Sequence, residues 1–547
     1  MIELGVVEVE RLLGEHPDVW TNPPRRELIS QAIRRREAIV TASGALATWT
    51  PLHSTGRRPK DTYIVDRPEI HAAVDWSSPY CNPIDPETFA ELVEDALAAL
   101  ERKRRLYLME KSLGADPRYS LRVRVVTDRA LHALFVDNLF RPPTRAPSAL
   151  GDEPFDLLVL PYDRLDPRKY VGKLRFDPEA GRTADMAVAM DFAGRAGVVF
   201  GSAYMGSVKK LLFTVMNFLL PEVGVLPLHC SANVGQEGDV ALFLGLSGTG
   251  KTSLSTDPSR PMIGDDEHGW SDSGIFNLEG GCYAKLIGLS PEKEPGIWHA
   301  VMHEAPPLEH GAILENAMVY PDGTIDLSDR RLTENSRASY PLGFLPNIAP
   351  GARGGHPTVI FFLTADAYGV LPPIAKLDRA GAMFWFLMGY TSKLAGTETG
   401  VVEPVATFSR FFGEPFMPRK PSVYAGMLGE KMRAHGARVY LVNTGWIGGP
   451  YGVGKRIDIS LTRAMIRAAL SGELEGVGHR EDPLFHLEVP VRCPGVPEGI
   501  LFPARSWRNR DAYRAKAEEL AAAFRKHFSA TFAHAVPPEV AARCPGE

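Results

Sequence analysis

The residues with the clearest chemical potential lie at positions 245–252, which read Gly-Leu-Ser-Gly-Thr-Gly-Lys-Thr. A β-rich run at 239–244 leads into them, so the GxxxxGK[ST] pattern has the strand context that a phosphate-binding loop needs. Glycines let backbone amides converge on phosphate oxygens, Lys251 supplies positive charge, and the Thr252 hydroxyl can ligate Mg²⁺. The segment predicts a nucleoside triphosphate site, with a plain glycine-rich turn as the alternative.

An acidic segment follows this loop closely. Pro258 comes soon after Lys251, and proline disfavours helix in the residue before it, so the helix after the loop must be short. An apolar pair then precedes residues 265–268, which read Asp-Asp-Glu-His. Neighbouring side chains on an extended backbone face opposite ways, so we expect Asp265 and Asp266 to serve different partners. A solvated acidic turn is the alternative.

A second candidate site involves His229, at the end of a predicted strand over 225–229. A lone histidine is more often a core or surface residue than a ligand, but an imidazole and the Asp266 carboxylate together form a reasonable donor set for Mn²⁺. Lys210 could join them only as a neutral amine. The residues alone leave Lys210 open between a metal ligand, a phosphate contact and a solvated side chain.

The composition excludes several classes of protein. The chain has 547 residues, 44% of them hydrophobic, so it can bury a large core. Its 61 Lys and Arg against 66 Asp and Glu give a net charge of −5, which offers no general attraction for nucleic acid or an anionic membrane. The five cysteines form no CxxC pair, which argues against a disulfide scaffold and a structural zinc ribbon. The longest apolar stretch, 381–390, is roughly half of what spans a bilayer, so no transmembrane helix is predicted. The first residues do not resemble a signal segment, so we expect a cytoplasmic protein.

Helical and strand patterns are mixed along the chain, which predicts an α/β fold. Apolar spacing of three and four predicts helices over 86–111 and 511–528. From residue 224 onward, short apolar runs are punctuated by glycine, as expected for buried strands with functional loops at their ends. We therefore expect two large domains with a boundary near residue 225. The predicted strands are 121–126, 155–160, 225–229, 240–245, 262–265, 359–365 and 439–444.

Eight segments in order along the chain resemble the family of ATP-dependent phosphoenolpyruvate carboxykinases. They are 55–61 (TGRRPKD), 229–235 (HCSANVG), 245–255 (GLSGTGKTSLS), 263–270 (IGDDEHGW), 280–285 (GGCYAK), 333–341 (TENSRASYP), 362–373 (FLTADAYGVLPP) and 443–456 (NTGWIGGPYGVGKR). GTP-using relatives are written differently around the phosphate loop. The resemblance implies a two-domain, phosphoenolpyruvate carboxykinase-like α/β fold. Residues 1–225 would form an N-terminal substrate-binding α/β domain, and residues 226–547 a C-terminal mononucleotide-binding domain that contains the P-loop.

The resemblance also implies a reaction. Oxaloacetate and ATP would give phosphoenolpyruvate, ADP and CO₂, a decarboxylation and phosphorylation that belongs to gluconeogenesis. Decarboxylation leaves an enolate, whose negative charge needs a cation beside it. The family holds this Mn²⁺ with the positions that match Lys210, His229 and Asp266.

Transfer of the phosphoryl group is mainly positioning and charge neutralisation. By the resemblance, these tasks fall to Lys251, Arg337 and a Mg²⁺ on Thr252, with Asp265 steadying the Mg²⁺ through water. The catalytic residues implied are Arg57, Lys210, Lys251 and Arg337.

The implied substrate contacts look ordinary without the resemblance. Arg57 lies in a basic loop that would otherwise be interpreted as a solvated turn. In the family this position clamps the substrate carboxylate, since a guanidinium can bind a carboxylate with two parallel hydrogen bonds. Tyr204, otherwise a core aromatic, matches a position that lies against the substrate. Lys210 and Arg337 complete the implied substrate site.

Two departures from the family pattern stand between Tyr204 and the lysine pair 209–210. The family usually has a small residue, Gly, Glu and Met there, whereas this chain has Met, Gly, Ser and Val. Met205 and Ser207 are the departures, and the carboxylate missing at Ser207 changes the charge near Lys210.

A second glycine-rich segment, 449–456, nearly repeats the phosphate-loop pattern. Arg456 stands where a magnesium-binding hydroxyl would be needed, so this segment is not a second P-loop. In the family the matching segment contacts the nucleotide, and a flexible glycine turn is the alternative. The resemblance implies ATP contacts from Lys210, His229, Gly245, Leu246, Ser247, Gly248, Thr249, Gly250, Lys251, Thr252, Ser253, Glu294, Arg337, Arg456, Ile457 and Thr462.

Two other classes of function stay open at this point. A P-loop kinase for small molecules would use ATP without decarboxylation and would need a general base. A regulatory protein with a dead site would bind ATP without turnover, which the intact Lys251 and Thr252 count against. The expected partners are the small molecules oxaloacetate and ATP, with no nucleic acid and no membrane. The residues do not decide between a monomer and a homo-oligomer.

Overall fold

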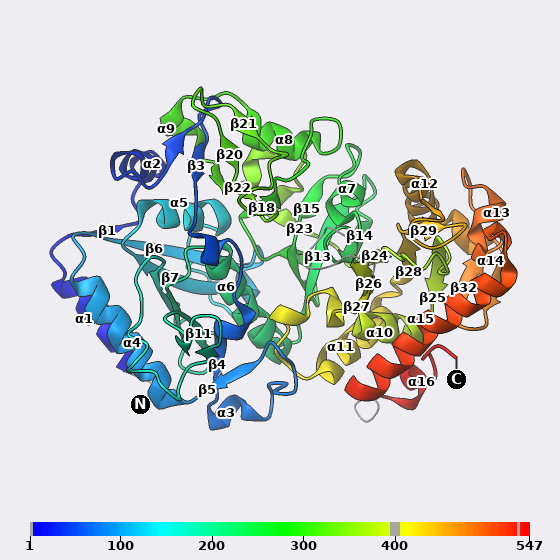
Figure 1. Cartoon of the computed structure of the whole chain (residues 1–547), viewed down its shortest axis with the longest axis horizontal. Coiled ribbons are helices and arrows are strands. Elements are labelled where there is room, and N and C mark those ends of the chain that lie inside the picture. The colour runs from blue at the N-terminus through cyan, green and yellow to red at the C-terminus, as the bar shows by residue number, and fades with distance from the viewer. Residues whose placement is uncertain (1–3, 394–404, 533–535, 547) are drawn as a thin grey trace. The chain divides into compact units, whose positions relative to one another are not determined.

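The computed structural model describes residues 4–393, 405–532 and 536–546. Residues 1–3, which belong to the start considered above for a signal segment, lie outside this range. Helices and strands are mixed in both halves of the chain, so the predicted α/β class is confirmed (Figure 1). No helix in the described part is both long and apolar enough to cross a membrane, and most of 381–390 lies in helix α10 (Arg379–Met388).

The chain forms two compact units. Unit 1 comprises Met1–Gly224, Asn277–Ile348 and Pro415–Arg419, and unit 2 comprises Val225–Phe276, Ala349–Glu414 and Lys420–Glu547. The chain first changes unit between Gly224 and Val225. Segments 277–348 and 415–419, however, belong to unit 1, although the sequence assigned them to the C-terminal domain. Long-range pairing explains the first of these, because β19 (Ile313–Glu315) pairs in parallel with β3 (Leu46–Thr48).

The larger sheet of unit 1 has eight strands in the order β1-β6-β7-β8-β12-β11-β4-β5. Helix α4 (Pro86–Glu101) packs on it, with Leu92 and Leu97 in one core cluster with Leu158 and Val198 of the sheet. The strands are β1 Val19–Thr21, β4 Thr62–Val65, β5 Asn82–Ile84, β6 Leu106–Leu113, β7 Leu121–Thr127, β8 Phe155–Leu160, β11 Ala187–Asp191 and β12 Ala196–Phe200.

Helix α4 corrects one prediction, because it ends ten residues before the predicted end at 111. Asp85 caps its start by accepting a hydrogen bond from the Thr88 amide at 2.7 Å. Residues 106–111 lie instead in strand β6, which pairs with β1 and β7. The basic run 102–105 interrupts the apolar helical spacing, and the pairing on both sides of β6 outweighs what local spacing remains.

The second sheet of unit 1 has five strands in the order β18-β22-β19-β3-β2. It joins strands from the first 50 residues to strands from 281–341. Its other strands are β2 Ile39–Val40, β18 Gly281–Lys285 and β22 Arg337–Pro341, and two short hairpins pair β9 Phe176–Asp177 with β10 Arg182–Thr183 and β20 Met318–Val319 with β21 Ile325–Asp326.

Figure 1 shows α1 beside α4 in unit 1. The helices of this unit are α1 Leu4–Glu15, α2 Arg25–Arg34, α3 Pro68–His71, α4, α5 Ala130–Leu139, α6 Gly206–Leu219, α8 Pro295–Met302 and α9 Pro307–His310.

Unit 2 is built on an eleven-stranded sheet in the order β23-β17-β16-β13-β14-β24-β28-β25-β32-β31, with β15 also paired to β13. The five strands predicted after residue 224 all fall in this sheet. β14 pairs in parallel with β24, and β24 with β28. The strands are β13 Leu226–Val234, β14 Val240–Gly245, β15 Met262–Gly264, β16 Glu267–Ser271, β17 Gly274–Asn277, β23 Arg353–Gly354, β24 Pro357–Thr364, β25 Ile374–Leu377, β28 Arg438–Asn443, β31 His479–Asp482 and β32 Leu487–Pro490.

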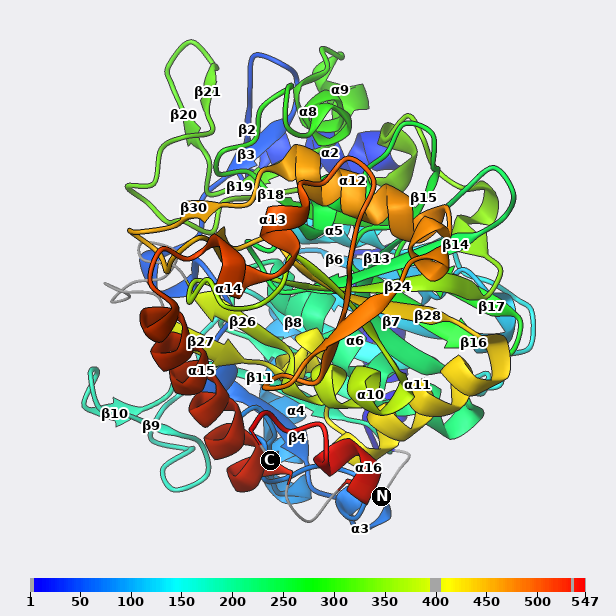
Figure 2. The same ribbon diagram turned by 90° about the vertical axis from the view of Figure 1, so that its right-hand side faces the viewer.

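The helices of unit 2 include the two whose predictions from the sequence agree best with the structure. α7 (Lys251–Ser255) has five residues, which confirms the short helix expected before Pro258. The helix predicted over 511–528 is α15 (Arg510–Thr531), drawn in dark red in Figure 2, beside β27. The remaining elements are α10, α11 Pro421–His435, α12 Ile459–Leu470, α13 Glu498–Leu501, α14 Pro503–Ser506, α16 Pro538–Ala541 and the pairs β26 Tyr390–Lys393 with β27 Val405–Phe408 and β29 Trp446–Ile447 with β30 Lys455–Arg456.

Candidate functional site

The glycine loop joins the end of β14 to the start of α7, so the strand, loop and helix follow in the predicted order. Gly248 and Gly250 have φ angles of +87° and +90°, which other residues rarely adopt. Gly245 is needed for a different reason, because a Cβ there would lie 2.5 Å from Thr249 Oγ1. That hydroxyl donates to the Leu246 carbonyl at 2.8 Å and closes the loop.

Two acidic residues face the end of this loop, each with its own partner. Lys251 Nζ donates to Asp266 Oδ1 at 3.0 Å, and Thr252 Oγ1 donates to Asp265 Oδ1 at 3.3 Å. The expectation that Asp265 and Asp266 serve different partners is therefore confirmed. Burial alone would lower the pKa of Lys251, but the carboxylates of Asp266 and Asp265 raise that pKa above its usual value. Lys251 is thus a cation held in place by a carboxylate.

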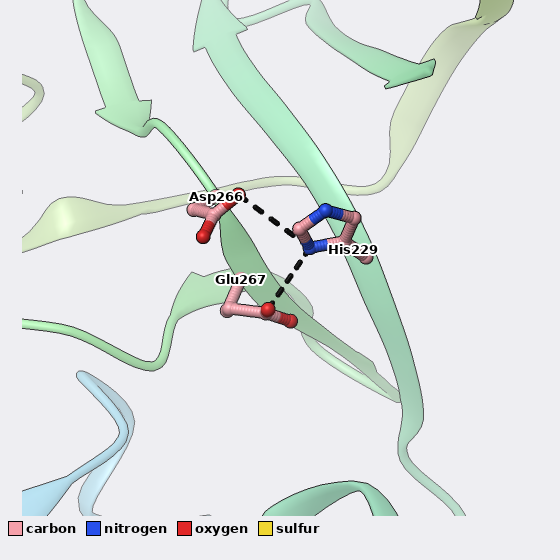
Figure 3. Close-up of side chains that lie close together, drawn as sticks. All are labelled: His229, Asp266 and Glu267. Carbon is pink, nitrogen blue, oxygen red and sulfur yellow. Dashed lines mark hydrogen bonds and ion pairs between the residues drawn. The ribbon is translucent and has the colours of Figure 1, made fainter. Parts of the chain in front are cut away.

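A candidate cation site lies beside Lys251. Among the described residues, His229, Asp266 and Glu267 form the one group of three His, Cys, Asp or Glu side chains whose ligand atoms all lie within 4.8 Å of one another. His229 Nδ1 is 2.9 Å from Glu267 Oε1 and 3.5 Å from Asp266 Oδ1 (Figure 3). One imidazole and two carboxylates are a donor set that suits divalent first-row metals.

Sequence reasoning missed Glu267, although it named both neighbours in this cluster. Glu267 is fully buried at the start of β16, directly opposite His229 in the antiparallel pairing of β13 and β16. That register joins residues 38 positions apart, and nothing local in the sequence specifies it. The one available signal was that Glu267 adjoins Asp266. Lys210, the third predicted ligand, belongs to unit 1, so its coordination stays a prediction.

The second glycine-rich segment packs against the phosphate loop within unit 2. Arg456 Nη2 donates to the Gly248 carbonyl at 2.9 Å, and Arg456 Nε donates to the Thr444 carbonyl at 3.0 Å. Thr444 Oγ1 in turn donates to the Thr249 carbonyl at 3.0 Å. The predicted residues Ile457 and Thr462 are both buried next to this segment.

In unit 1, Arg57 and Lys210 line a single pocket, together with Arg58, Tyr80, Ser207 and Phe416 among others. The Arg57 guanidinium and the Lys210 ammonium each lie 4.4 Å from the centroid of the Phe416 ring. Both basic groups therefore lie within cation–π distance of one aromatic ring, which favours positive charge there. Ser207 also lines the pocket and brings no charge, so the basic side chains set the charge of the pocket.

The other two predicted substrate residues meet around Tyr283, also in unit 1. The Tyr204 and Tyr283 ring centroids are 5.9 Å apart, and the Arg337 guanidinium lies 5.8 Å from the Tyr283 centroid. Arg337 opens β22, where it stands opposite Glu315 of β19. The sequence analysis did not identify Tyr283 or Glu315 as candidate site residues.

Two further side chains bear on the predicted site residues: Lys209, the neighbour of Lys210, and Glu294, a predicted ATP contact. Lys209 Nζ lies 2.9 Å from Glu279 Oε1, and both side chains are almost fully buried, so this lysine of the pair is committed to an internal ion pair. Glu294 precedes helix α8 in unit 1, whereas the glycine loop belongs to unit 2. Its expected contact with ATP therefore stays a prediction.

A glycine loop that ends at a lysine and threonine, next to a cation site, is the arrangement of phosphoryl-transfer proteins. The comparisons give the particular family. The family model described as phosphoenolpyruvate carboxykinase matches residues 17–499, and the chain belongs to the ATP-dependent phosphoenolpyruvate carboxykinase family.

Three curated relatives show how much of the chain is shared. The chain is 49% identical to phosphoenolpyruvate carboxykinase (ATP) of Geobacillus kaustophilus over 96% of both chains. It is 50% identical to phosphoenolpyruvate carboxykinase (ATP) 1 of Moorella thermoacetica over 93% of this chain and 94% of the relative. It is 47% identical to phosphoenolpyruvate carboxykinase (ATP) of Thermus thermophilus over 97% of this chain and 98% of the relative. The similarity therefore covers both units.

Proposed function

We propose that this protein converts oxaloacetate and ATP to phosphoenolpyruvate, ADP and CO₂, the carboxy-lyase step of gluconeogenesis. Membership of the family and the names of its relatives support this activity. The observation that carries it is the position of Asp266, whose Oδ1 lies 3.0 Å from Lys251 Nζ and 3.5 Å from His229 Nδ1. One carboxylate thus joins the nucleotide loop to a cation site, as a reaction that combines an enolate with a phosphoryl group requires.

The nucleotide roles fall to the loop of unit 2, which we assign as the P-loop of a mononucleotide-binding domain. Backbone amides of 245–253 would bind phosphate oxygens, and the Lys251 cation would neutralise charge on the transferred group. Thr252 would ligate the Mg²⁺ that accompanies ATP, with Asp265 holding that ion through water. The contacts of Arg456 with the loop support a role next to the nucleotide for this residue and its neighbours Ile457 and Thr462.

His229 and Asp266 would hold a Mn²⁺, with Lys210 as the third proposed ligand. Glu267 accepts a hydrogen bond from His229 Nδ1, which would orient the ring for the ion. When bound, the ion supplies positive charge that favours the enolate left by decarboxylation.

Unit 1 would bind the keto acid. Arg57 would clamp one carboxylate with two parallel hydrogen bonds, in the pocket that Lys210 also lines. Tyr204 and Arg337 would contact the substrate, and Arg337 would also neutralise the transferred phosphoryl group. The bond to the departing carboxyl breaks, its electron pair passes to the enolate, and the enolate oxygen attacks the γ-phosphorus of ATP as ADP leaves. A cytoplasmic location and the absence of nucleic-acid partners remain predictions from the sequence.

The test supplies purified protein with Mn²⁺, Mg²⁺ and oxaloacetate, and compares ATP with GTP. We expect phosphoenolpyruvate and CO₂ with ATP and far less with GTP. No phosphoenolpyruvate would refute the proposal. ATP turnover without CO₂ release would favour a small-molecule kinase, and ATP binding without turnover would favour a regulatory protein. His229→Gln should lose activity or manganese dependence, whereas His299→Gln, an exposed histidine on α8, should retain both.

A further inference from the structure

Glu315 is a fully buried carboxyl group that the proposed roles leave unused. It ends β19, the middle strand of the five-stranded sheet in unit 1. A buried carboxylate is costly unless its oxygens accept hydrogen bonds, so the partners of this side chain indicate what it is for.

The two carboxyl oxygens of Glu315 hold two different segments. Oε1 accepts a hydrogen bond from the Met205 amide at 3.0 Å, and Oε2 accepts one from the Tyr283 hydroxyl. Met205 directly follows Tyr204 and directly precedes helix α6, which carries Lys210. Glu315 therefore fixes the backbone next to one proposed substrate residue and at the start of the helix that bears another.

The turn that carries Tyr204 is held from a second side as well. The amides of Ala203 and Tyr204 both donate to Ser54 Oγ, at 2.8 and 3.3 Å. Ser54 is fully buried and lies three residues before Arg57. Three consecutive amides, 203–205, are thus bound by two buried side chains, so the turn has little freedom.

The Tyr283 ring extends the effect of Glu315 to Arg337. With its hydroxyl bound by Glu315, the ring has the Tyr204 ring 5.9 Å away and the Arg337 guanidinium 5.8 Å away. Arg337 also stands opposite Glu315 in the pairing of β19 with β22. Tyr204 and Arg337 therefore share one aromatic neighbour whose orientation depends on one carboxyl group.

We propose that Glu315 is a positioning residue for oxaloacetate, which holds Tyr204 and Arg337 in one fixed arrangement through the Met205 amide and the Tyr283 hydroxyl. The proposal rests on the proposed function, because that function places Tyr204 and Arg337 against the keto acid. Glu315 itself touches no reacting atom in this account.

A purely structural role predicts a different outcome from a positioning role. Burial raises the pKa of Glu315 to about 7, so keeping it ionised works against folding at neutral pH. A neutral glutamine of the same shape should therefore leave the fold intact. It brings an NH₂ group where a carboxyl oxygen accepted a bond, which disturbs the contact with Tyr283 or Met205.

The experiment compares Glu315→Gln with wild type. We expect KM for oxaloacetate to rise about tenfold, the equivalent of one lost hydrogen bond to a charged group. KM for ATP should rise less, because only Arg337 of the two positioned side chains is also assigned to ATP. Phosphoenolpyruvate binding, measured by calorimetry, should weaken by about the same factor. The melting temperature should not fall. Glu309→Gln, an exposed glutamate on α9, should match wild type in all four measurements.

A second variant separates the two hydrogen bonds that Glu315 accepts. Tyr283→Phe removes only the hydroxyl and keeps the ring, so we expect a smaller rise in KM for oxaloacetate. The double variant should lose less than the product of the two single effects, because both changes act on the same hydrogen-bonded pair.

Two outcomes would overturn the proposal. One is a Glu315→Gln enzyme whose KM for oxaloacetate and affinity for phosphoenolpyruvate lie within about twofold of wild type. The other is an equal loss for both substrates together with a lower melting temperature, which would assign Glu315 a structural role. Failure of the proposed function would be seen separately, as a wild-type enzyme that forms no phosphoenolpyruvate.

Discussion

Lys251 Nζ donates a hydrogen bond to Oδ1 of Asp266, at 3.0 Å. That oxygen also faces His229 Nδ1 at 3.5 Å, so the lysine of the glycine loop and the imidazole of the cation site meet at one carboxylate. The preceding residue, Asp265, faces Thr252 instead. Two adjacent carboxylates therefore serve two different sites, and their substitutions should have separable effects.

The first prediction concerns Asp266→Asn. Removing this charge takes one ligand from the proposed Mn²⁺ site and the counter-charge from Lys251, so we expect Mn²⁺ affinity to fall by about 10- to 100-fold. Titration of free Mn²⁺ by electron paramagnetic resonance measures it. Asp265→Asn is the matched control and should instead raise KM for Mg-ATP, with Mn²⁺ affinity little changed. Equal effects of the two variants on Mn²⁺ would contradict the assignment.

The second prediction concerns Lys251→Met. The lysine is held as a cation by Asp266, and it would neutralise charge on the transferred phosphoryl group. Its loss should lower kcat by about 10²- to 10³-fold at saturating ATP, the usual effect of removing one such group. The rate of phosphoenolpyruvate formation measures it. Lys526→Met, at an exposed position on α15, should keep the wild-type rate. A kcat within about threefold of wild type would remove Lys251 from the chemistry.

The sequence was most informative where the chemistry and the backbone are both local. The loop 245–252 needs glycines at 248 and 250 for its left-handed turns, and the strand before it is a short buried run. Both requirements depend on residues that are close together in the sequence, so β14, the loop and the short α7 could all be predicted. The different partners of Asp265 and Asp266 were also predicted, although these residues lie in a bend between β15 and β16 and not on an extended strand.

The sequence was least informative where distant strands decide the structure. Residues 106–111 carry enough apolar spacing to look helical, yet pairing on both sides makes them a strand. Glu267 and Glu315 gain their partners through strand registers and turns that lie tens of residues away in sequence. The inclusion of 277–348 in unit 1 has the same origin, since β19 pairs with β3.

The third prediction concerns Arg456→Lys. Arg456 binds the Gly248 and Thr444 carbonyls through two different nitrogens, and a lysine ammonium cannot reproduce that fork. We expect the loop to lose order, so that KM for ATP rises about five- to thirtyfold while KM for oxaloacetate is unchanged. Initial rates with either substrate varied give both constants.

The matched control is Arg463→Lys. Arg463, on α12, reaches helix α7 directly after the loop, through one longer bond of 3.3 Å to the Ser253 carbonyl. Its substitution should change KM for ATP by less than about twofold. A larger effect at Arg463 than at Arg456 would show that the paired contacts of Arg456 do not hold the loop.

The fourth prediction concerns the pH dependence of stability at Glu315. Burial, opposed by hydrogen bonds from Met205 and Tyr283, raises the pKa of this carboxyl group from its usual 4.5 to about 7. Between these two values the folded protein binds more protons at this site than the unfolded chain does. The site's contribution to the free energy of unfolding therefore falls as pH rises from 4.5 to about 7. At about 1.4 kcal/mol per pH unit, the loss is about 3 kcal/mol.

Glutamine at position 315 cannot ionise, so it escapes this loss. The stability of Glu315→Gln relative to wild type should rise steadily between pH 5 and pH 7.5, by up to about 3 kcal/mol, as followed by urea unfolding. The exposed Glu309→Gln should show no such trend, because its carboxyl group is not buried. A difference between Glu315→Gln and wild type that is constant with pH would mean that this carboxyl group is already ionised at pH 5. The Met205 and Tyr283 hydrogen bonds would then fully offset the effect of burial on the pKa of Glu315.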